Sequence, residues 1–180
     1  MRHQDVRAQH GWMRKLILPL VLLAPLSTVH AAPKPGSALI DYDGYMKLTR
    51  EVRPYRAKRL LPLSEFRAKA SRSEALLLDA RSAQAFAEGH IEGAINLPFP
   101  DFTAEALAKL IGPNRNRPIY IYCNNNFSDN RRPVVTKALP LALNIQTFVN
   151  LYGYGYKNVW ELADVIRMAD PATGWVTGPA

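Results

Sequence analysis

The chain has 180 residues, of which 48% are hydrophobic and 21% charged, and its formal net charge is +8. This length accommodates one domain, and the composition is ordinary for a globular protein with a buried core, which argues against a multidomain enzyme. Cys123 is the only cysteine, so an intramolecular disulfide is excluded.

Residues 1–31 have the order of a signal peptide: basic residues, an apolar run over 16–26 and a small-residue site that ends at Ala31. The run is too short to span a bilayer, and it lacks the polar positions at helical spacing that a buried core helix needs. Met13 would begin a shorter leader of the same kind. We therefore expect cleavage near Ala31 and a periplasmic or secreted protein, and no later apolar run predicts a membrane span.

Residues 32–59 predict a linker followed by a basic extension that is helical around 44–52. Nine basic side chains, against two acidic ones, lie within residues 47–72. Such a stretch can attract an acidic protein, an anionic lipid or a nucleic acid. Because no nucleic-acid motif accompanies it, we expect a solvated basic face and no bound nucleic acid, with a protein partner as the open alternative.

A domain of alternating strands and helices is predicted over 60–168. It begins with a short extended piece, after which Ser64 predicts the N-cap of a helix that reaches Arg72. The apolar run 76–80 has the length of a strand and the continuous hydrophobicity of a parallel strand covered on both faces. Ser82 then predicts the N-cap of a second helix.

The same alternation continues up to the cysteine. Residues 94–97 predict a strand, 103–111 a third helix and 119–122 a β-branched and aromatic strand that leads into Cys123. Strands that alternate with short helices indicate an α/β fold with a mainly parallel sheet.

The part of the chain after the cysteine is harder to assign. A helix is predicted over 134–143. The last strand is predicted at 158–162, and the alternative is a strand at 147–151 with a helix over 156–168. Residues 169–180 contain two glycines and two prolines and predict a loose C-terminal tail.

Cys123 lies at the carboxyl end of a predicted strand, where ligands bind in parallel sheets. The asparagine-rich loop that follows can adopt left-handed backbone conformations, and successive N–H groups would then converge on the sulfur as an anion-binding nest. Such a nest would lower the pKa of the thiol and favour the thiolate. The alternative is that Cys123 is an inert buried residue at the end of its strand.

Several stretches combine into one longer pattern: residues 77–82 with Phe86 and residues 89–98, then residues 119–123, then residues 155–162. In that order they resemble the leading signature of the rhodanese family, its strand into the active-site cysteine and its last strand motif. The resemblance covers about residues 60–165. It implies a rhodanese-like fold, with a central, mainly parallel sheet of about five strands flanked by helices.

The resemblance also implies a sulfurtransferase of the thiosulfate sulfurtransferase type, which needs no metal or organic cofactor. The catalytic residue would be Cys123, which takes a sulfane sulfur from a donor as a persulfide and passes it to a thiophilic acceptor. The residues predicted to bind the small sulfur-containing or anionic substrate are Asn124, Asn125, Asn126, Phe127, Ser128 and Arg131. Structural roles are predicted for Asp79, Arg81 and His90.

The loop after the cysteine departs from the family pattern, because it is longer and carries Asp129 where the family's compact turn ends. An acidic side chain there opposes an anionic donor unless it points outward or pairs with Arg131 or Arg132. Two further hypotheses therefore stay open beside the sulfurtransferase. One is a non-catalytic rhodanese-like module that binds a protein partner or an anion, and the other is a cysteine phosphatase, which would need an arginine in place of Asp129.

Overall fold

The computed structural model describes residues 39–132 and 135–178. The predicted signal peptide at 1–31 and the linker at 32–37 lie outside the described residues. None of the helices in the described part has both the length and the apolar character needed to cross a membrane.

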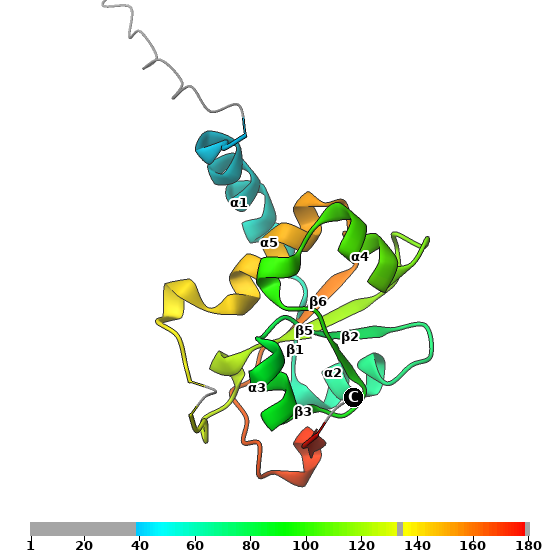
Figure 1. The fold of residues 1–180 in the computed structure, drawn as a ribbon, viewed down its shortest axis with the longest axis vertical. Coiled ribbons are helices and arrows are strands. Elements are labelled where there is room, and N and C mark those ends of the chain that lie inside the picture. The colour runs from blue at the N-terminus through cyan, green and yellow to red at the C-terminus, as the bar shows by residue number, and fades with distance from the viewer. Residues whose placement is uncertain (1–38, 133–134, 179–180) are drawn as a thin grey trace, which may run out of the picture. The chain divides into compact units, whose positions relative to one another are not determined.

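A five-stranded sheet forms the centre of the fold (Figure 1). All neighbouring strands are parallel, and their order is β1 (Leu60–Leu61), β6 (Val159–Leu162), β5 (Ile119–Tyr122), β2 (Leu76–Asp79) and β4 (Ala94–Asn96). The middle strands β2 and β5 are buried over their whole length, which explains their nearly continuous apolar sequences. The predicted α/β fold with a mainly parallel sheet is confirmed.

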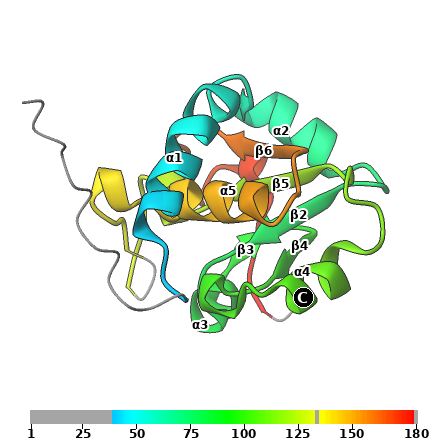
Figure 2. The same ribbon diagram turned by 90° about the horizontal axis from the view of Figure 1, so that it is seen from above.

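Helices cover both faces of the sheet and divide the hydrophobic core in two. One face carries α1 (Tyr42–Arg56), α4 (Ala104–Ile111) and α5 (Leu143–Gly153), and the other carries α2 (Leu63–Ala70) and α3 (Ala83–Glu88). Side chains of β2 alternate between the two cores, with Leu76 and Leu78 on the first side and Leu77 on the second. Figure 2 shows α1 and α5 side by side on their common face.

The predicted helix around 44–52 is part of α1, which is longer and packs into the fold. Val52 is buried in the core, and the Tyr152 hydroxyl of α5 donates a hydrogen bond to Glu51 Oε1 over 2.7 Å. This bond raises the pKa of Tyr152 to about 12. At the end of α1, Arg56 forms a two-bond ion pair with Glu161 of β6 at 2.5 Å. The helix is therefore fixed to the sheet by both apolar and ionic contacts.

Of the two predicted helix caps, Ser82 is confirmed and Ser64 is wrong, and Thr103 is a further cap that the sequence analysis did not name. Ser82 and Thr103 accept hydrogen bonds from the backbone N–H groups of the first turns of α3 and α4. Ser64 is not a cap, because α2 begins one residue earlier, at Leu63. The Leu63 N–H donates instead to Asp164 Oδ2 over 2.7 Å, so the acceptor comes from a distant segment.

The helix predicted over 134–143 is wrong. Residues 135–138 are not helical, a single 3₁₀ turn covers Leu139–Leu141, and α5 begins only at Leu143. Pro140 explains the difference, because proline lacks the N–H that a helix interior needs. The alternative strand at 147–151 is also wrong, since those residues lie within α5, whereas the strand predicted at 158–162 is confirmed as β6.

The expectation of a loose terminus is wrong for residues 171–176. Trp175–Val176 forms strand β7, which pairs antiparallel with β3 (His90–Ile91), and Thr173 is fully buried. The Trp175 indole lies so close to Gly89 that a Cβ built there would be 2.3 Å from its Nε1 atom. The glycine is therefore required for the C-terminal segment to pack where it does.

Candidate functional site

Cys123 follows β5 directly and stands at the carboxyl edge of the sheet. Its side chain is only 1% exposed. The next three residues, Asn124–Asn126, form one 3₁₀ turn, in which the thiol accepts from the Asn126 N–H. In return, the Cys123 N–H donates to Asn126 Oδ1 over 2.9 Å. This reciprocal pair fixes the direction in which the sulfur points.

Backbone N–H groups from two segments converge on the thiol. Asn125 contributes one from the 3₁₀ turn, and Leu143 and Asn144 contribute two from the first turn of α5. The N-cap residue of α5 is Ala142, which offers no side-chain acceptor, so the sulfur serves as an acceptor for this helix end. The predicted convergence of N–H groups is present, but two of these three groups come from a helix that the sequence did not place there.

The backbone conformation differs from the predicted nest. No residue other than glycine has a positive φ in the described ranges 39–132 and 135–178. The asparagines after Cys123 therefore stay in the right-handed region, and the tight 3₁₀ turn aims their N–H groups.

The pKa of Cys123 is raised, which is the opposite of the predicted shift. Burial is the largest cause, because it disfavours the charged thiolate. The hydrogen bonds from Asn144, Asn125 and Leu143 act in the other direction but do not outweigh it, and the negative charge of Glu161 adds to the increase. At neutral pH the folded protein therefore holds Cys123 mainly as the thiol.

The side chains of the three consecutive asparagines hold the long loop in place. The Asn124 amide donates to the Val135 carbonyl over 3.0 Å. Asn125 exchanges two hydrogen bonds with the backbone of Lys137, at 2.8 and 3.1 Å. Asn126 donates to the carbonyls of Leu162 and Asp164 beyond β6. The residues predicted to bind substrate thus make structural bonds with their side chains.

The remaining predicted substrate-binding residues lie away from the thiol cradle. Phe127 is buried against Tyr122 and Trp175 in the second core. Ser128 is bonded through both its N–H and its hydroxyl to the Ile166 carbonyl, and Arg131 is exposed to solvent.

Asp129, the acidic residue in the loop, points to the C-terminal segment. Its carboxylate accepts from the N–H groups of Met168 and Ala169 at 2.7 and 3.1 Å. Desolvation alone would raise the pKa of Asp129, but these two bonds outweigh it and the pKa is lowered. The carboxylate is therefore satisfied by backbone donors of another segment.

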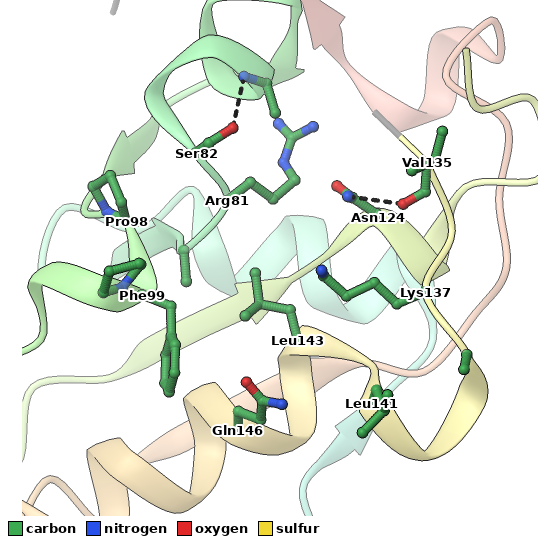
Figure 3. A pocket seen from close by; sticks show the side chains of 14 residues that line it. Arg81, Ser82, Pro98, Phe99, Asn124, Val135, Lys137, Leu141, Leu143 and Gln146 are labelled. Atoms are coloured by element: carbon green, nitrogen blue, oxygen red, sulfur yellow. Dashed lines mark hydrogen bonds between the residues drawn. The ribbon is translucent and has the colours of Figure 1, made fainter. Parts of the chain in front are cut away.

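A cavity of about 700 Å³ opens beside the cysteine at the carboxyl edge of the sheet (Figure 3). Its lining comes from the segments that follow β2, β4 and β5, the start of α3, the far arm of the loop and the start of α5: Ala80, Arg81, Ser82, Ala85, Pro98, Phe99, Pro100, Asn124, Val135, Lys137, Ala138, Leu141, Leu143 and Gln146. Asn124 is the one predicted substrate-binding residue among them, and Arg81 the one predicted structural residue.

A buried polar network closes the end of β2. Asp79 accepts from Arg81 Nε and Nη2 and from the Tyr122 hydroxyl, at distances between 2.5 and 3.0 Å. Arg81 Nη2 also donates to the Gly89 carbonyl, and the ion pair keeps the pKa of Arg81 raised although desolvation opposes this. His90 is buried and stacked on Phe86, 3.8 Å between ring centroids.

Sequence reasoning missed the contribution of α5 to the site. Asn144 has a side-chain amide that donates to Asn126 Oδ1 and to Glu161 Oε1, at 3.0 and 3.2 Å, and Glu161 is in turn paired with Arg56. A chain of polar contacts thus runs from α1 to the backbone of Cys123. The available signal was Pro140, which places the helix start after itself.

The described residues contain no group of three or more His, Cys, Asp or Glu side chains placed to hold a metal ion.

A sequence model of the rhodanese-like domain matches residues 63–164. The chain belongs to the rhodanese-like domain family. The match begins after α1 and β1. No curated protein matches the sequence.

Solved structures of rhodanese-like domains are among the similar folds. The rhodanese-like domain of an Anabaena protein shares 18% identity with this chain over 64% of this chain and 72% of its own length, with a TM-score of 0.42. The polysulfide-sulfur transferase homodimer of Wolinella succinogenes shares 14% identity, over 68% and 79% of the two chains, with a TM-score of 0.38. The sulfur transferase subunit of yeast mitochondrial complex I shares 18% identity, over 58% and 38%, with a TM-score of 0.38.

Proposed function

We propose that this rhodanese-like protein is a sulfurtransferase in which Cys123 carries the transferred sulfur as a persulfide. The observation that supports the proposal is the convergence of the Asn125, Leu143 and Asn144 N–H groups on the thiol. Donors of this kind stabilise a negatively charged sulfur, and a persulfide anion places its charge on the outer sulfur atom.

The reaction consists of two displacements at sulfur. The Cys123 thiolate attacks the sulfane sulfur of a donor, a new S–S bond forms, and the donor's own bond to that sulfur breaks. The leaving group departs with the electron pair. A thiophilic acceptor then attacks the outer sulfur of the persulfide, and the Cys123 thiolate is released. Neither step needs an oxidant or a reductant.

Access to the sulfur requires movement of the loop that the asparagines hold. Cys123 is 1% exposed, and its pKa is raised, so both entry of the donor and loss of the thiol proton limit the first step. We therefore expect sulfur loading to become faster with increasing pH in the range just above neutrality, because the reactive thiolate becomes more populated.

The test is donor-dependent mass spectrometry of the purified protein. Treatment with a polysulfide or a thiosulfonate should add the mass of one sulfur atom to wild type and none to Cys123→Ser, and addition of cyanide should remove it with formation of thiocyanate. Cys123→Ser leaves the fold intact in this proposal, so its circular dichroism spectrum serves as the control. A wild-type mass that no sulfane donor changes would refute the proposal.

The burial of the thiol favours a second candidate, a non-catalytic module that binds a partner. In that case the bonds of Asn124 and Asn125 to Val135 and Lys137 would hold a recognition loop, and Cys123 would be an inert core residue. Cys123→Ser would then retain every activity of the protein. Loss of sulfur transfer in this variant separates the two candidates.

Export and a protein partner for the basic segment are further parts of this proposal. Within 47–72, several basic side chains have structural contacts: Arg56 with Glu161, Arg59 with the rings of Tyr55 and Trp160, and Lys69 with Glu65. The remaining exposed basic residues are Lys47, Arg50, Arg53, Lys58 and Arg72. N-terminal sequencing of the protein from fractionated cells tests export, since it should find a start just after Ala31.

A further inference from the structure

A buried carboxylate lies near the thiol on the same side of the sheet. Glu161 of β6 is only 5% exposed, and in the register of the two strands it lies opposite Ile121 of β5. Because side chains alternate along an extended chain, Ile121 and Cys123 point to the same face. The strand spacing and the rise per residue place Glu161 about 8 Å from Cys123, measured between their backbones. A free negative charge at that distance would oppose formation of the thiolate.

The charge of Glu161 is compensated from α1. Arg56 Nε and Nη2 each donate to one carboxylate oxygen of Glu161 over 2.5 Å, which is the two-bond arrangement that suits a guanidinium and a carboxylate. No other cation of the described ranges 39–132 and 135–178 forms an ion pair with Glu161. The neighbours from β1 and α5 are uncharged, since Leu60 lies opposite it in the sheet and Asn144 reaches it with an amide. The neutrality of this group therefore depends on Arg56.

Hydrogen bonds connect the same carboxylate to the turn that carries the thiol. The Asn144 amide donates to Glu161 Oε1 over 3.2 Å and to Asn126 Oδ1 over 3.0 Å. Asn126 Oδ1 also accepts from the Cys123 N–H, and the backbone N–H of Asn144 is directed at the sulfur. One side chain thus links the position of the carboxylate to that of the sulfur, and Arg56 holds the carboxylate from the opposite side.

The other groups around the thiol leave Glu161 as the negative charge that matters. The 3₁₀ turn and the first turn of α5 contribute N–H groups and amides. At the end of the neighbouring strand β2, Arg81 is paired with Asp79, and Lys137 is a lining residue of the cavity. Burial raises the pKa of Cys123 most, and the charge of Glu161 adds to the increase. Compensation of this one carboxylate therefore makes the thiolate easier to form.

We propose that Arg56 is a positioning residue of the sulfur-transfer site, which acts from α1 by holding and neutralising the Glu161 carboxylate beside Cys123. The proposal rests on the sulfurtransferase function and assigns a role to a residue that precedes the matched region 63–164. Arg56 does not line the cavity, and it acts through the charge and the position of Glu161. Loss of Arg56 leaves a buried anion near the sulfur, so the thiolate should form less readily.

The experiment follows the pH dependence of Cys123 alkylation on the purified full chain, with iodoacetamide as an uncharged reagent. Arg56→Met should move the midpoint of the thiolate titration up by about one pH unit, the effect of a free carboxylate about 8 Å away in a partly buried site. Arg56→Lys keeps the positive charge and should stay close to wild type. Glu161→Gln keeps an acceptor for Arg56 and Asn144 but loses the charge, so its midpoint should move down.

The double variant Arg56→Met with Glu161→Gln separates charge from packing. It has no carboxylate to compensate, so its midpoint should return from that of Arg56→Met to about the wild-type value. A midpoint that stays with Arg56→Met would assign the effect to disturbed packing of α1 and overturn the proposal. Glu161→Gln tests the proposal without loss of Arg56, and an unchanged midpoint there would also overturn it.

Arg53→Met is the matched control. Arg53 is an exposed arginine in the same last turn of α1, and its replacement changes the net charge by the same amount as Arg56→Met. No ion pair of Arg53 is present in the described part of the chain. This variant should titrate like wild type, and thermal unfolding of all variants shows whether they are folded.

Sulfur loading of the same variants by polysulfide, followed by intact mass, distinguishes this proposal from the transferase function. Arg56→Met should load about threefold more slowly at neutral pH, because an about tenfold loss of thiolate is partly offset by the greater nucleophilicity of a more basic sulfur. Loading rates and midpoints that are equal in all variants would overturn the role of Arg56 and leave the persulfide function standing. Shifted midpoints without persulfide in any variant would support the role of Arg56 and refute the transferase. Equal midpoints without persulfide would overturn both.

Discussion

The ends of β2 and β5 lie next to each other in the sheet, but they are built in different ways. At the end of β2, Asp79 and Arg81 form a buried ion pair that Tyr122 and Gly89 complete. At the end of β5, Cys123 lies among backbone N–H groups, and a long loop covers it. A buried ion pair demands strict geometry, whereas a neutral thiol among N–H groups costs little to rearrange. The first end is thus suited to hold the sheet edge rigid, and the second to change its chemical state.

The strongest test of this comparison is removal of charge at the end of β2. Asp79→Ala leaves the Arg81 guanidinium buried without its anionic partner, and we expect a loss of about 3–5 kcal/mol of unfolding free energy. Urea unfolding followed by tryptophan fluorescence measures it. Asp101→Asn, at an exposed carboxylate, is the control and should lose little. A loss of less than about 1 kcal/mol for Asp79→Ala would show that the ion pair does not hold this edge.

Asn126→Ala tests the other strand end. It removes the acceptor of the Cys123 N–H and the donor to the Leu162 and Asp164 carbonyls, so we expect a loss of about 2 kcal/mol in stability. The Cys123 thiol should also react faster with iodoacetamide, because the turn over it loosens. The control is Asn150→Ala, which removes one local bond to the Gln146 carbonyl of the same helix. Unchanged thiol reactivity in Asn126→Ala would contradict the role given to the turn.

The raised pKa of Cys123 predicts a specific dependence of stability on pH. The folded-state pKa of the thiol lies above its unfolded-state pKa. The contribution of the neutral thiol to the free energy of unfolding is therefore complete below the unfolded-state pKa and is lost as pH rises through the folded-state pKa. The stability difference between wild type and Cys123→Ala should therefore fall by about 1.4 kcal/mol per pH unit in that alkaline window.

Glu161→Gln sharpens the same measurement. The variant lacks the negative charge that helps to raise the pKa of Cys123, so the folded-state pKa should move down toward the unfolded value. The pH range over which the stability difference falls should therefore end at a lower pH. A difference between wild type and Cys123→Ala that stays constant with pH would mean that the thiol titrates alike in the folded and unfolded chains.

Asp129→Asn should have the smallest effect. Asp129 anchors the loop to the N–H groups of Met168 and Ala169, and its pKa is lowered. Its contribution to the free energy of unfolding is therefore present above the unfolded-state pKa of the carboxyl group and is lost as pH falls through the folded-state pKa. We expect a loss of about 0.5–1 kcal/mol at neutral pH, since the site is close to solvent. Thermal unfolding at neutral and acidic pH measures it, and the difference from wild type should disappear in acid. A difference that persists there would assign the effect to packing.

The regular part of the fold could be predicted from the sequence, because its signals are local. The apolar run at 76–80, the cap Ser82 and the strand before Cys123 each depend on residues near in sequence. Predictions were wrong where the partner is distant. The acceptor for the start of α2 comes from Asp164, and β7 gains its place only by pairing with β3 across more than eighty residues.

The sequence by itself determined the family, the parallel sheet and the position of Cys123 at a strand end, since these follow from hydrophobic periodicity and a motif of fixed spacing. Only the tertiary structure decided the state of that cysteine. Its pKa depends on how deeply α5 and the loop bury it, and burial outweighs the N–H groups that the sequence led us to expect. The cavity likewise could not be predicted from the sequence, because Phe99, Lys137 and Leu143 come from three segments that line it together only in the folded chain.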